Sequence, residues 1–244
     1  MNIDKKYYQE INENLTNTIQ DTNISAPNKK VGKVRDAYFL NDKVVMISTD
    51  RQSAFDRVLA AIPYKGAVLN SVSAWWFKKT EHLFPNHLIS TPDPNVSIVE
   101  KCTVFPVEFV VRGYITGTTD TSLWTVYNNG DREYCGNSLP EGLKKNDKLD
   151  KPMLTPTTKD KVHDRPVSRE EIIDLGLMSA EDYDLAAKMS LDLFAFGQET
   201  AKKNGLILVD TKYEIGTDSK GKIKFVDEIH TPDSSRFWLS LIHI

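Results

Sequence analysis

The chain has 244 residues, a formal net charge of −3 and a pI near 6.0. This length can bury the core of one large domain or of two joined lobes. The negative balance gives no general basic surface for nucleic acid or an anionic membrane, and the two cysteines are too few for a disulfide framework. The sequence has no signal-peptide core and no apolar run of bilayer length, so we expect a cytoplasmic protein.

The first half of the chain alternates helical and strand patterns. Apolar residues from Tyr8 to Ile19 at helical spacing predict a short amphipathic helix within the first twenty residues. Residues 30–50 contain two strand-like runs separated by Asn41-Asp42, a pattern that predicts a β-meander. Residues 70–85 predict a helix that Pro85 ends, and residues 101–117 predict another strand.

The second half begins with residues 128–167, which are rich in Asn, Asp, Gly, Pro and Lys and predict loops or a small insertion. Ser168 with Glu171 forms a capping box, and Gly176 closes that short helix. Ser179 with Asp182 opens a longer helix. Its predicted apolar stripe contains Leu185, Met189, Leu193 and Phe196. A hairpin is expected over residues 206–230, with its loop at residues 217–220.

The first strand of that hairpin, LILVDTKYEIG, begins apolar and then carries Asp210, Lys212 and Glu214 at alternate positions. Side chains alternate along a strand, so these three charges share one face. A solvated face with alternating signs is an equally good interpretation of the pattern alone. The four-residue loop would place Asp227 opposite Asp210, although one residue of slip would reverse its face. Carboxylates that converge from two strands suit Mg²⁺ together with phosphate oxygens.

Four further clusters carry anion-binding chemistry. Lys33 and Arg35 follow Gly32 and are expected to share one face of a strand. Arg112 ends an apolar strand before a run of hydroxyls, and Arg236 follows two serines. Residues 49–57, TDRQSAFDR, form the fourth cluster. By contrast, GTDSKGKI lacks both the hydroxyl and the helix of a phosphate-binding loop and predicts a polar turn.

The motifs GKVRDAY, STDRQSAFD, FPVEFVVRGYITGT, LTPTTKDKVHD, LVDTKYEIG and VDEIHTPDSSRFW together resemble the phosphoribosylaminoimidazole-succinocarboxamide (SAICAR) synthase family, in that family's order. They cover roughly residues 31–238. The resemblance implies an α+β fold with an antiparallel β-rich N-terminal lobe, a mixed α/β C-terminal lobe and ATP between them. It places the lobes at about residues 1–105 and 106–244 of one catalytic unit.

The resemblance also implies the reaction: ATP-dependent condensation of carboxyaminoimidazole ribonucleotide (CAIR) with L-aspartate to SAICAR, ADP and phosphate, in purine biosynthesis. The implied partners are these small molecules, with neither nucleic acid nor membrane, and the oligomeric state stays open. Carried over by motif, Glu214 and Asp227 hold Mg²⁺, with Lys212 and Asp210 as the catalytic residues beside them. The ATP-binding residues are Gly32, Lys33, Arg35 and Glu108. The substrate-binding residues are Asp50, Ser53, Asp56, Arg112, Thr118, Lys159, Asp233, Ser235 and Arg236.

The chain departs from the family pattern at three places. Thr118 stands for a usual Ser, and Ile215 for a usual Phe on the face away from the charges. After about residue 239 the family's C-terminal segment is expected, but the chain ends in LSLIHI. Two alternatives to an active ligase therefore remain: a truncated form that binds nucleotide without turnover, and a related small-molecule kinase.

Overall fold

The computed structural model describes residues 5–26, 28–54, 57–159 and 164–240. The chain forms two compact units, which are described separately. The first comprises Met1–Lys78 and His87–Lys101, and the second comprises Lys79–Asn86 and Cys102–Ile244. Antiparallel sheets with few helices confirm the predicted α+β class. Within the described ranges, no helix is both long and apolar enough to cross a membrane.

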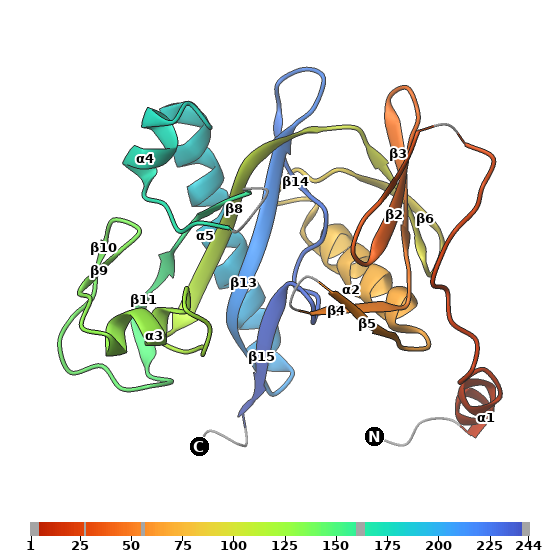
Figure 1. Ribbon diagram of the computed structural model, residues 1–244, viewed down its shortest axis with the longest axis horizontal. Coiled ribbons are helices and arrows are strands. Elements are labelled where there is room, and N and C mark those ends of the chain that lie inside the picture. Colours follow the sequence, from red (N-terminus) through yellow and green to blue (C-terminus); the bar gives the residue numbers. More distant parts are fainter. Residues whose placement is uncertain (1–4, 27, 55–56, 160–163, 241–244) are drawn as a thin grey trace. The chain divides into compact units, whose positions relative to one another are not determined.

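The first unit is built on an antiparallel five-stranded sheet in the order β1-β2-β3-β7-β6 (Figure 1). The predicted meander is confirmed, because β2 and β3 pair on either side of Asn41-Asp42. A separate hairpin joins β4 to β5. The strands are β1 (Lys29–Val31), β2 (Arg35–Phe39), β3 (Lys43–Ser48), β4 (Arg51–Ala54), β5 (Arg57–Ala61), β6 (Leu88–Asp93) and β7 (Val96–Glu100).

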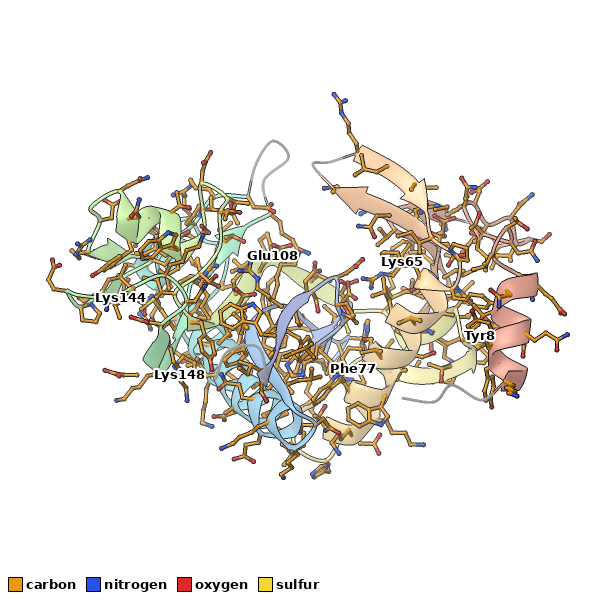
Figure 2. All side chains as sticks on the ribbon, turned by 90° about the horizontal axis from the view of Figure 1, so that it is seen from below. Tyr8, Lys65, Phe77, Glu108, Lys144 and Lys148 are labelled. Carbon is orange, nitrogen blue, oxygen red and sulfur yellow. The ribbon has the colours of Figure 1, made fainter. Side chains whose placement is uncertain are left out.

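Two helices complete this unit. The predicted N-terminal helix is confirmed in part as α1 (Lys5–Glu13), which ends before Leu15 and Ile19, and Tyr8 and Ile11 on its apolar side are exposed in this unit. Helix α2 (Lys65–Thr80) starts earlier than expected and ends before Pro85. It buries Phe77 and is tied to β7 by a 2.6 Å hydrogen bond from Ser97 to Asn70 (Figure 2 labels Lys65 and Phe77).

The second unit is built on a six-stranded sheet whose central strands β8 and β13 are both twelve residues long. Residues 128–167 were predicted as loops or a small insertion, and this was wrong in part, because β11 and β12 both pair with β8 in the main sheet. The main-sheet strands are β8 (Thr103–Tyr114), β11 (Lys148–Leu154), β12 (Thr157–Thr158), β13 (Leu206–Thr217), β14 (Ile223–Val226) and β15 (Ser235–Leu239). A small hairpin of β9 (Glu133–Tyr134) and β10 (Asn137–Ser138) lies outside the sheet.

The helices of the second unit are α3 (Leu123–Asn128), α4 (Arg169–Asp174) and α5 (Ala180–Lys203). The capping box of Ser168 and Glu171 on α4 is confirmed, and Ser179 caps α5 as predicted. The buried stripe of α5 includes Met189 and Leu193, but the prediction for Leu185 was wrong, since that side chain is 49% exposed. The inward face is rotated toward Tyr183, Ala186 and Phe194.

Helix α5 packs on one face of the six-stranded sheet (Figure 1). The ring of Tyr183 on α5 lies 5.7 Å from that of Phe109 on β8, and Phe109 is paired in register with Tyr213 on β13. Since side chains alternate along a strand, the neighbours of Phe109 and Tyr213 face away from α5. Those neighbours include Glu108, Lys212 and Glu214. The fold therefore buries the apolar face of β13 under α5 and directs its charges to the other face.

Candidate active site

The charged face of the second unit is formed by alternate residues of β8 and β13. The antiparallel register places Arg112 opposite Asp210 and Glu108 opposite Glu214. Paired residues project to the same side of a sheet, so all four side chains share the face that carries Lys212. Thr211, Tyr213 and Ile215 on the opposite face are buried at 2% exposure or less. The predicted sharing of one face by Asp210, Lys212 and Glu214 is confirmed.

Lys212 lies at the centre of this face. Its Nζ contacts Glu108 Oε1 at 2.8 Å, and Glu108 is itself a buried residue. Burial opposes the charge on Lys212, but the carboxylates of Glu108, Glu214 and Asp227 together raise its pKa. Lys212 therefore carries a firm positive charge at neutral pH, which suits the stabilisation of phosphate oxygens more than proton abstraction.

Glu214 is the carboxylate most affected by its surroundings. Burial raises its pKa, the nearby Asp227 raises it further, and Lys159 and Lys212 act in the opposite direction. Lys159 forms an ion pair with Glu214. Two neighbouring carboxylates that repel one another are the chemistry that a cation relieves, and here the Lys159 ammonium occupies that role.

The predicted register of the β13–β14 hairpin was wrong, but the prediction that Asp227 lies near the charges of β13 is confirmed. β14 pairs Ile223 with Thr217 and Val226 with Glu214, so the connecting loop has five residues rather than four. Strand β14 then ends, and Asp227 adopts a left-handed backbone with φ of 63°. Strand alternation therefore no longer decides where Asp227 points, and its charge acts on Glu214 and Lys212.

Asp210 lies at the other end of the charged face, near two guanidinium groups. Its Oδ1 is 3.7 Å from Arg236 Nε, and its Oδ2 is buried without a hydrogen-bond partner among the described residues. Burial raises the pKa of Asp210, while Arg236 and Arg112 oppose this rise. A buried acceptor that lacks a donor is costly, so Asp210 Oδ2 is suited to accept a hydrogen bond from a bound molecule.

Arg112 and Arg236 are held by hydroxyls from other segments. Arg112 Nε donates to Thr155 Oγ1 at 2.8 Å, and Arg236 Nη1 donates to Thr116 Oγ1 at 3.5 Å. The turn after β8 requires Gly117, because its φ is +104° and a Cβ there would lie 2.4 Å from Ser122 Cβ. Two arginines beside an exposed, hydroxyl-rich turn form a site suited to a phosphate.

Comparison with known proteins identifies this arrangement. The family model described as SAICAR synthetase matches residues 28–241. A phosphoribosylaminoimidazole-succinocarboxamide synthase of Legionella pneumophila is 59% identical over 221 residues, which span 91% of this chain and 71% of that protein. The chain belongs to the SAICAR synthetase family.

Other members of the SAICAR synthetase family agree with this. The chloroplastic enzyme of Arabidopsis thaliana is 58% identical over 94% of this chain and 57% of its own length. The Saccharomyces cerevisiae SAICAR synthase, solved in complex with SAICAR, superposes with a TM-score of 0.80 at 32% identity, over 91% of this chain and 80% of that one. A SAICAR synthetase in complex with ADP gives 0.75 at 28% identity, over 88% of this chain and 85% of that one.

The remaining residues that the family resemblance named in the second unit are Thr118, Asp233 and Ser235. Thr118 and Asp233 are exposed, in the turn after β8 and just before β15 respectively. Ser235 differs from Arg236, because its hydroxyl lies 2.7 Å from that of Thr211, on the face opposite the charges. Its assignment to a phosphate stays a prediction.

The residues named in the first unit are differently placed. Lys33 lies in the turn between β1 and β2, so the expectation that Lys33 and Arg35 share one face of a strand was wrong. Asp50 is buried, and its two oxygens accept the backbone N–H groups of Ile19 and Gly66 at 2.8 and 2.9 Å. Ser53 lies half-buried on β4, and Asp56 lies outside the described residues.

Sequence reasoning missed two supporting groups. Thr155 orients Arg112, and its position beside β8 follows only from the pairing of residues 148–158 with that strand. Arg51 belongs to the predicted anion-binding cluster of residues 49–57, but its guanidinium is buried among backbone carbonyls of the first unit. No local sequence signal separates such a structural arginine from a ligand-binding one.

Proposed function

We propose that this chain catalyses the ATP-dependent condensation of CAIR with L-aspartate to give SAICAR, ADP and phosphate. The observation that carries the proposal is the 59% identity to a named SAICAR synthase across 91% of the chain, together with a charged face that the fold keeps clear of helix α5. The reaction is that of a carbon–nitrogen ligase of purine biosynthesis, and ATP supplies its driving force.

The chemistry consists of two displacements. A carboxylate oxygen of CAIR attacks the γ-phosphorus of ATP, which breaks the bond to ADP and yields an acyl phosphate. The aspartate amine then attacks the acyl carbon, the C–N bond forms, the C–O bond to phosphate breaks, and the amine loses a proton. Both steps depend on positioning and charge neutralisation more than on a protein nucleophile. Lys212 is suited to the charge that collects on the transferred phosphoryl oxygens, because its neighbours keep it protonated.

The metal assignment rests on whether the residues suit Mg²⁺. The described residues hold no group of three or more His, Cys, Asp and Glu side chains arranged for a metal ion. Two carboxylates, Glu214 and Asp227, act on one another, and Mg²⁺ commonly takes one or two carboxylates with the rest of its shell from phosphates and water. The pair therefore fits Mg²⁺. When bound, the ion neutralises and aligns the phosphates of ATP.

This fit also assigns a task to Lys159. Its ammonium is paired with Glu214 Oε2, and the approach of a cation to the same carboxylate would weaken this pair by repulsion. We therefore propose that the Lys159 ammonium leaves the Glu214 carboxylate and pairs with a phosphate oxygen when ATP binds.

The proposed roles of the other residues follow their surroundings. Asp210 accepts a hydrogen bond from CAIR through its unpartnered Oδ2, and Arg112 and Arg236 hold the ribonucleotide phosphate. In the first unit, Gly32, Lys33 and Arg35 bind the phosphates of ATP. Further roles are carried over by motif alone: nucleotide binding for Glu108; the ribose for Asp233; and the ribonucleotide phosphate for Thr118 and Ser235. Asp50, Ser53 and Asp56 line the region where the two carboxylate substrates meet, with Asp50 acting through the backbone segments whose N–H groups its oxygens accept.

The test is a full product balance with purified protein, ATP, Mg²⁺, CAIR and aspartate. We expect SAICAR, ADP and phosphate in equal amounts, and no SAICAR when either aspartate or CAIR is omitted. Saturable ATP binding without SAICAR would instead favour a non-catalytic nucleotide-binding form. ADP release that continues at full rate without aspartate would favour a kinase-like activity.

A further inference from the structure

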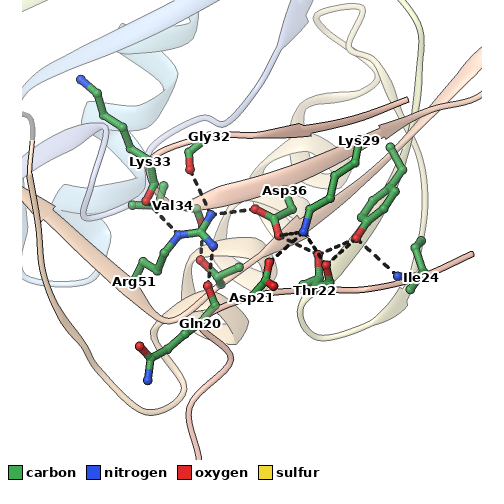
Figure 3. A network of polar contacts seen from close by, with 12 residues as sticks. Gln20, Asp21, Thr22, Ile24, Lys29, Gly32, Lys33, Val34, Asp36 and Arg51 are labelled. Carbon is green, nitrogen blue, oxygen red and sulfur yellow. Dashed lines mark hydrogen bonds and ion pairs between the residues drawn. The ribbon is translucent and has the colours of Figure 1, made fainter. Parts of the chain in front are cut away.

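The carbonyl groups of the hairpin turn between β1 and β2 accept hydrogen bonds from Thr49 and Arg51. Arg51 donates from Nη2 to Gly32 O at 3.0 Å and from Nε to Lys33 O at 3.1 Å (Figure 3). The next carbonyl, that of Val34, accepts both the backbone N–H and the hydroxyl of Thr49, at 2.9 and 2.7 Å. Three consecutive carbonyls of the turn therefore accept hydrogen bonds from Thr49 and Arg51.

This arrangement determines where the N–H groups of the turn point. A trans peptide directs its N–H opposite to its C=O, and the described residues contain no cis peptide. The carbonyls of Gly32 and Lys33 face the guanidinium, so the N–H groups of Lys33 and Val34 point away from it. Successive N–H groups on the outer side of a turn form a site for an anion. Gly32 is required here, because a Cβ would lie 2.8 Å from Arg35 O.

Arg51 is itself held in place by buried partners. Its Nη2 contacts Asp36 Oδ1 at 2.8 Å, and Asp36 has no exposed surface. Asp36 Oδ2 in turn accepts the hydroxyl of Thr22 at 2.7 Å and lies 3.0 Å from Lys29 Nζ. Arg51 Nη1 also donates to Gln20 O, which ties the segment before β1 to the same guanidinium (Figure 3).

We propose that Arg51 is a positioning residue for nucleotide binding: it aims the Lys33 and Val34 N–H groups of the β1–β2 turn at the phosphates of ATP. This inference rests on the proposed function, which assigns ATP phosphates to that turn. Only a planar, forked cation can satisfy two turn carbonyls, Gln20 O and Asp36 together, and the compact ammonium of lysine cannot replace it.

The experiment compares Arg51→Lys with a matched control, Lys29→Met. The control removes an ion pair with the same Asp36 but leaves the contacts of Arg51 to the turn intact. Calorimetry with ATP and with adenosine, and the KM values for ATP and aspartate, are measured for both variants. For Arg51→Lys we expect the Kd and KM of ATP to rise about tenfold or more, whereas the adenosine Kd and the aspartate KM stay within about twofold. Lys29→Met should leave all four values within about twofold.

A second measurement needs no variant. The amide ¹⁵N–¹H resonances of Lys33 and Val34 in the wild-type chain should shift on addition of inorganic tripolyphosphate, whereas adenosine should leave them in place. Unchanged ATP affinity in folded Arg51→Lys, equal weakening of ATP and adenosine, or amide resonances unmoved by saturating tripolyphosphate would each overturn the positioning role. Failure of the wild-type chain to bind ATP would instead overturn the proposed function, and this inference with it.

Discussion

Asp36 in the first unit and Asp210 in the second are both buried carboxylates on strands beside arginine, and they differ in what surrounds them. Asp36 receives hydrogen bonds from Arg51 and Thr22 and an ion pair from Lys29. Although its burial favours the neutral acid, these partners hold its pKa below the usual range. Asp210 has an oxygen without a partner, and burial raises its pKa.

The difference separates a charge that maintains the fold from one that awaits a ligand. Around Asp36 every contact is made within the protein, so the site is complete before any substrate arrives. Around Asp210 and Glu214 the neighbouring cations offset only part of the cost of burying the negative charge. Bound ligands can offset the remainder. Functional sites are commonly stabilised less well than structural ones, because binding provides the missing interactions.

Asp227→Asn should have the largest effect on activity. The substitution keeps the size of the side chain but removes the negative charge proposed for Mg²⁺, so the Mg²⁺-dependent turnover should fall by about a thousandfold or more. The fold should stay intact, because relief of the repulsion of Glu214 offsets the lost attraction to Lys212. Steady-state kinetics and thermal melts measure both effects, and wild-type rates would refute the metal assignment.

Asp36→Asn should have the largest effect on stability. It leaves the buried Arg51 cation without its carboxylate, which typically costs about 3–5 kcal/mol. The loss should be local to the first unit, so hydrogen exchange of the β2 and β3 amides is the suitable measurement. Lys29→Met serves as its control, because the exposed side of the network should cost far less. Equal protection in Asp36→Asn and wild type would show that the network is not structural.

Asp210→Asn should act in opposite directions on stability and activity. Because the substitution removes a desolvated charge, the melting temperature should stay the same or rise by a few degrees. The kcat/KM for CAIR should fall by about a hundredfold, because one acceptor oxygen is lost. Differential scanning calorimetry and initial rates with CAIR as the varied substrate measure the two effects. A destabilised variant with unaltered kinetics would make Asp210 a structural residue like Asp36.

The burial of His230 should have a smaller effect: it should make the stability of the second unit depend on pH. It is buried in the second unit beside Tyr213, and burial lowers its pKa from 6.5 to about 3. Between these values the unfolded chain binds a proton that the folded chain does not, so stability falls as the pH falls from 6.5 toward 3. One such group gives a slope of about 1.4 kcal/mol per pH unit.

Urea unfolding of the second unit, followed at several pH values, tests this slope. The lowered pKa of Asp36 has a separate window: its stabilisation is complete above the unfolded value of 3.8 and is lost only below it. The raised pKa values of Glu214 and Asp210 act in the opposite direction over part of this range, so the wild-type slope is compared with that of His230→Gln, and equal slopes in the two proteins would contradict the assignment.

Local signals in the sequence predicted local structure well. The capping box of Ser168 and Glu171 and the alternation along residues 210–215 each depend on neighbours within a few residues, and both are confirmed. The same reasoning placed Asp210, Lys212 and Glu214 on one face. Family motifs then assigned these charges to the active site, and that assignment stays a prediction.

Long-range pairing could not be predicted in the same way. The polar composition of residues 148–158 favours loops. These residues nevertheless form strands that pair with β8, because the backbone groups at the edge of β8 need hydrogen-bond partners. The β13–β14 register depended on one loop residue, which the composition of the loop does not define. Asp50 and Arg51 resemble ligand-binding residues in sequence, but backbone groups brought from residues 19–20, 32–33 and 66 occupy them.

The contrast between the two carboxylate sites can be tested in one measurement: ¹³C-NMR titration of the side-chain carboxylates with and without Mg²⁺ and a non-hydrolysable ATP analogue. Without ligand, Glu214 should titrate above its usual 4.5 and Asp36 below 3.8. With Mg²⁺ and nucleotide, the pKa of Glu214 should fall while that of Asp36 stays unchanged. A Glu214 that titrates at an ordinary pKa and does not respond to Mg²⁺ would contradict the account.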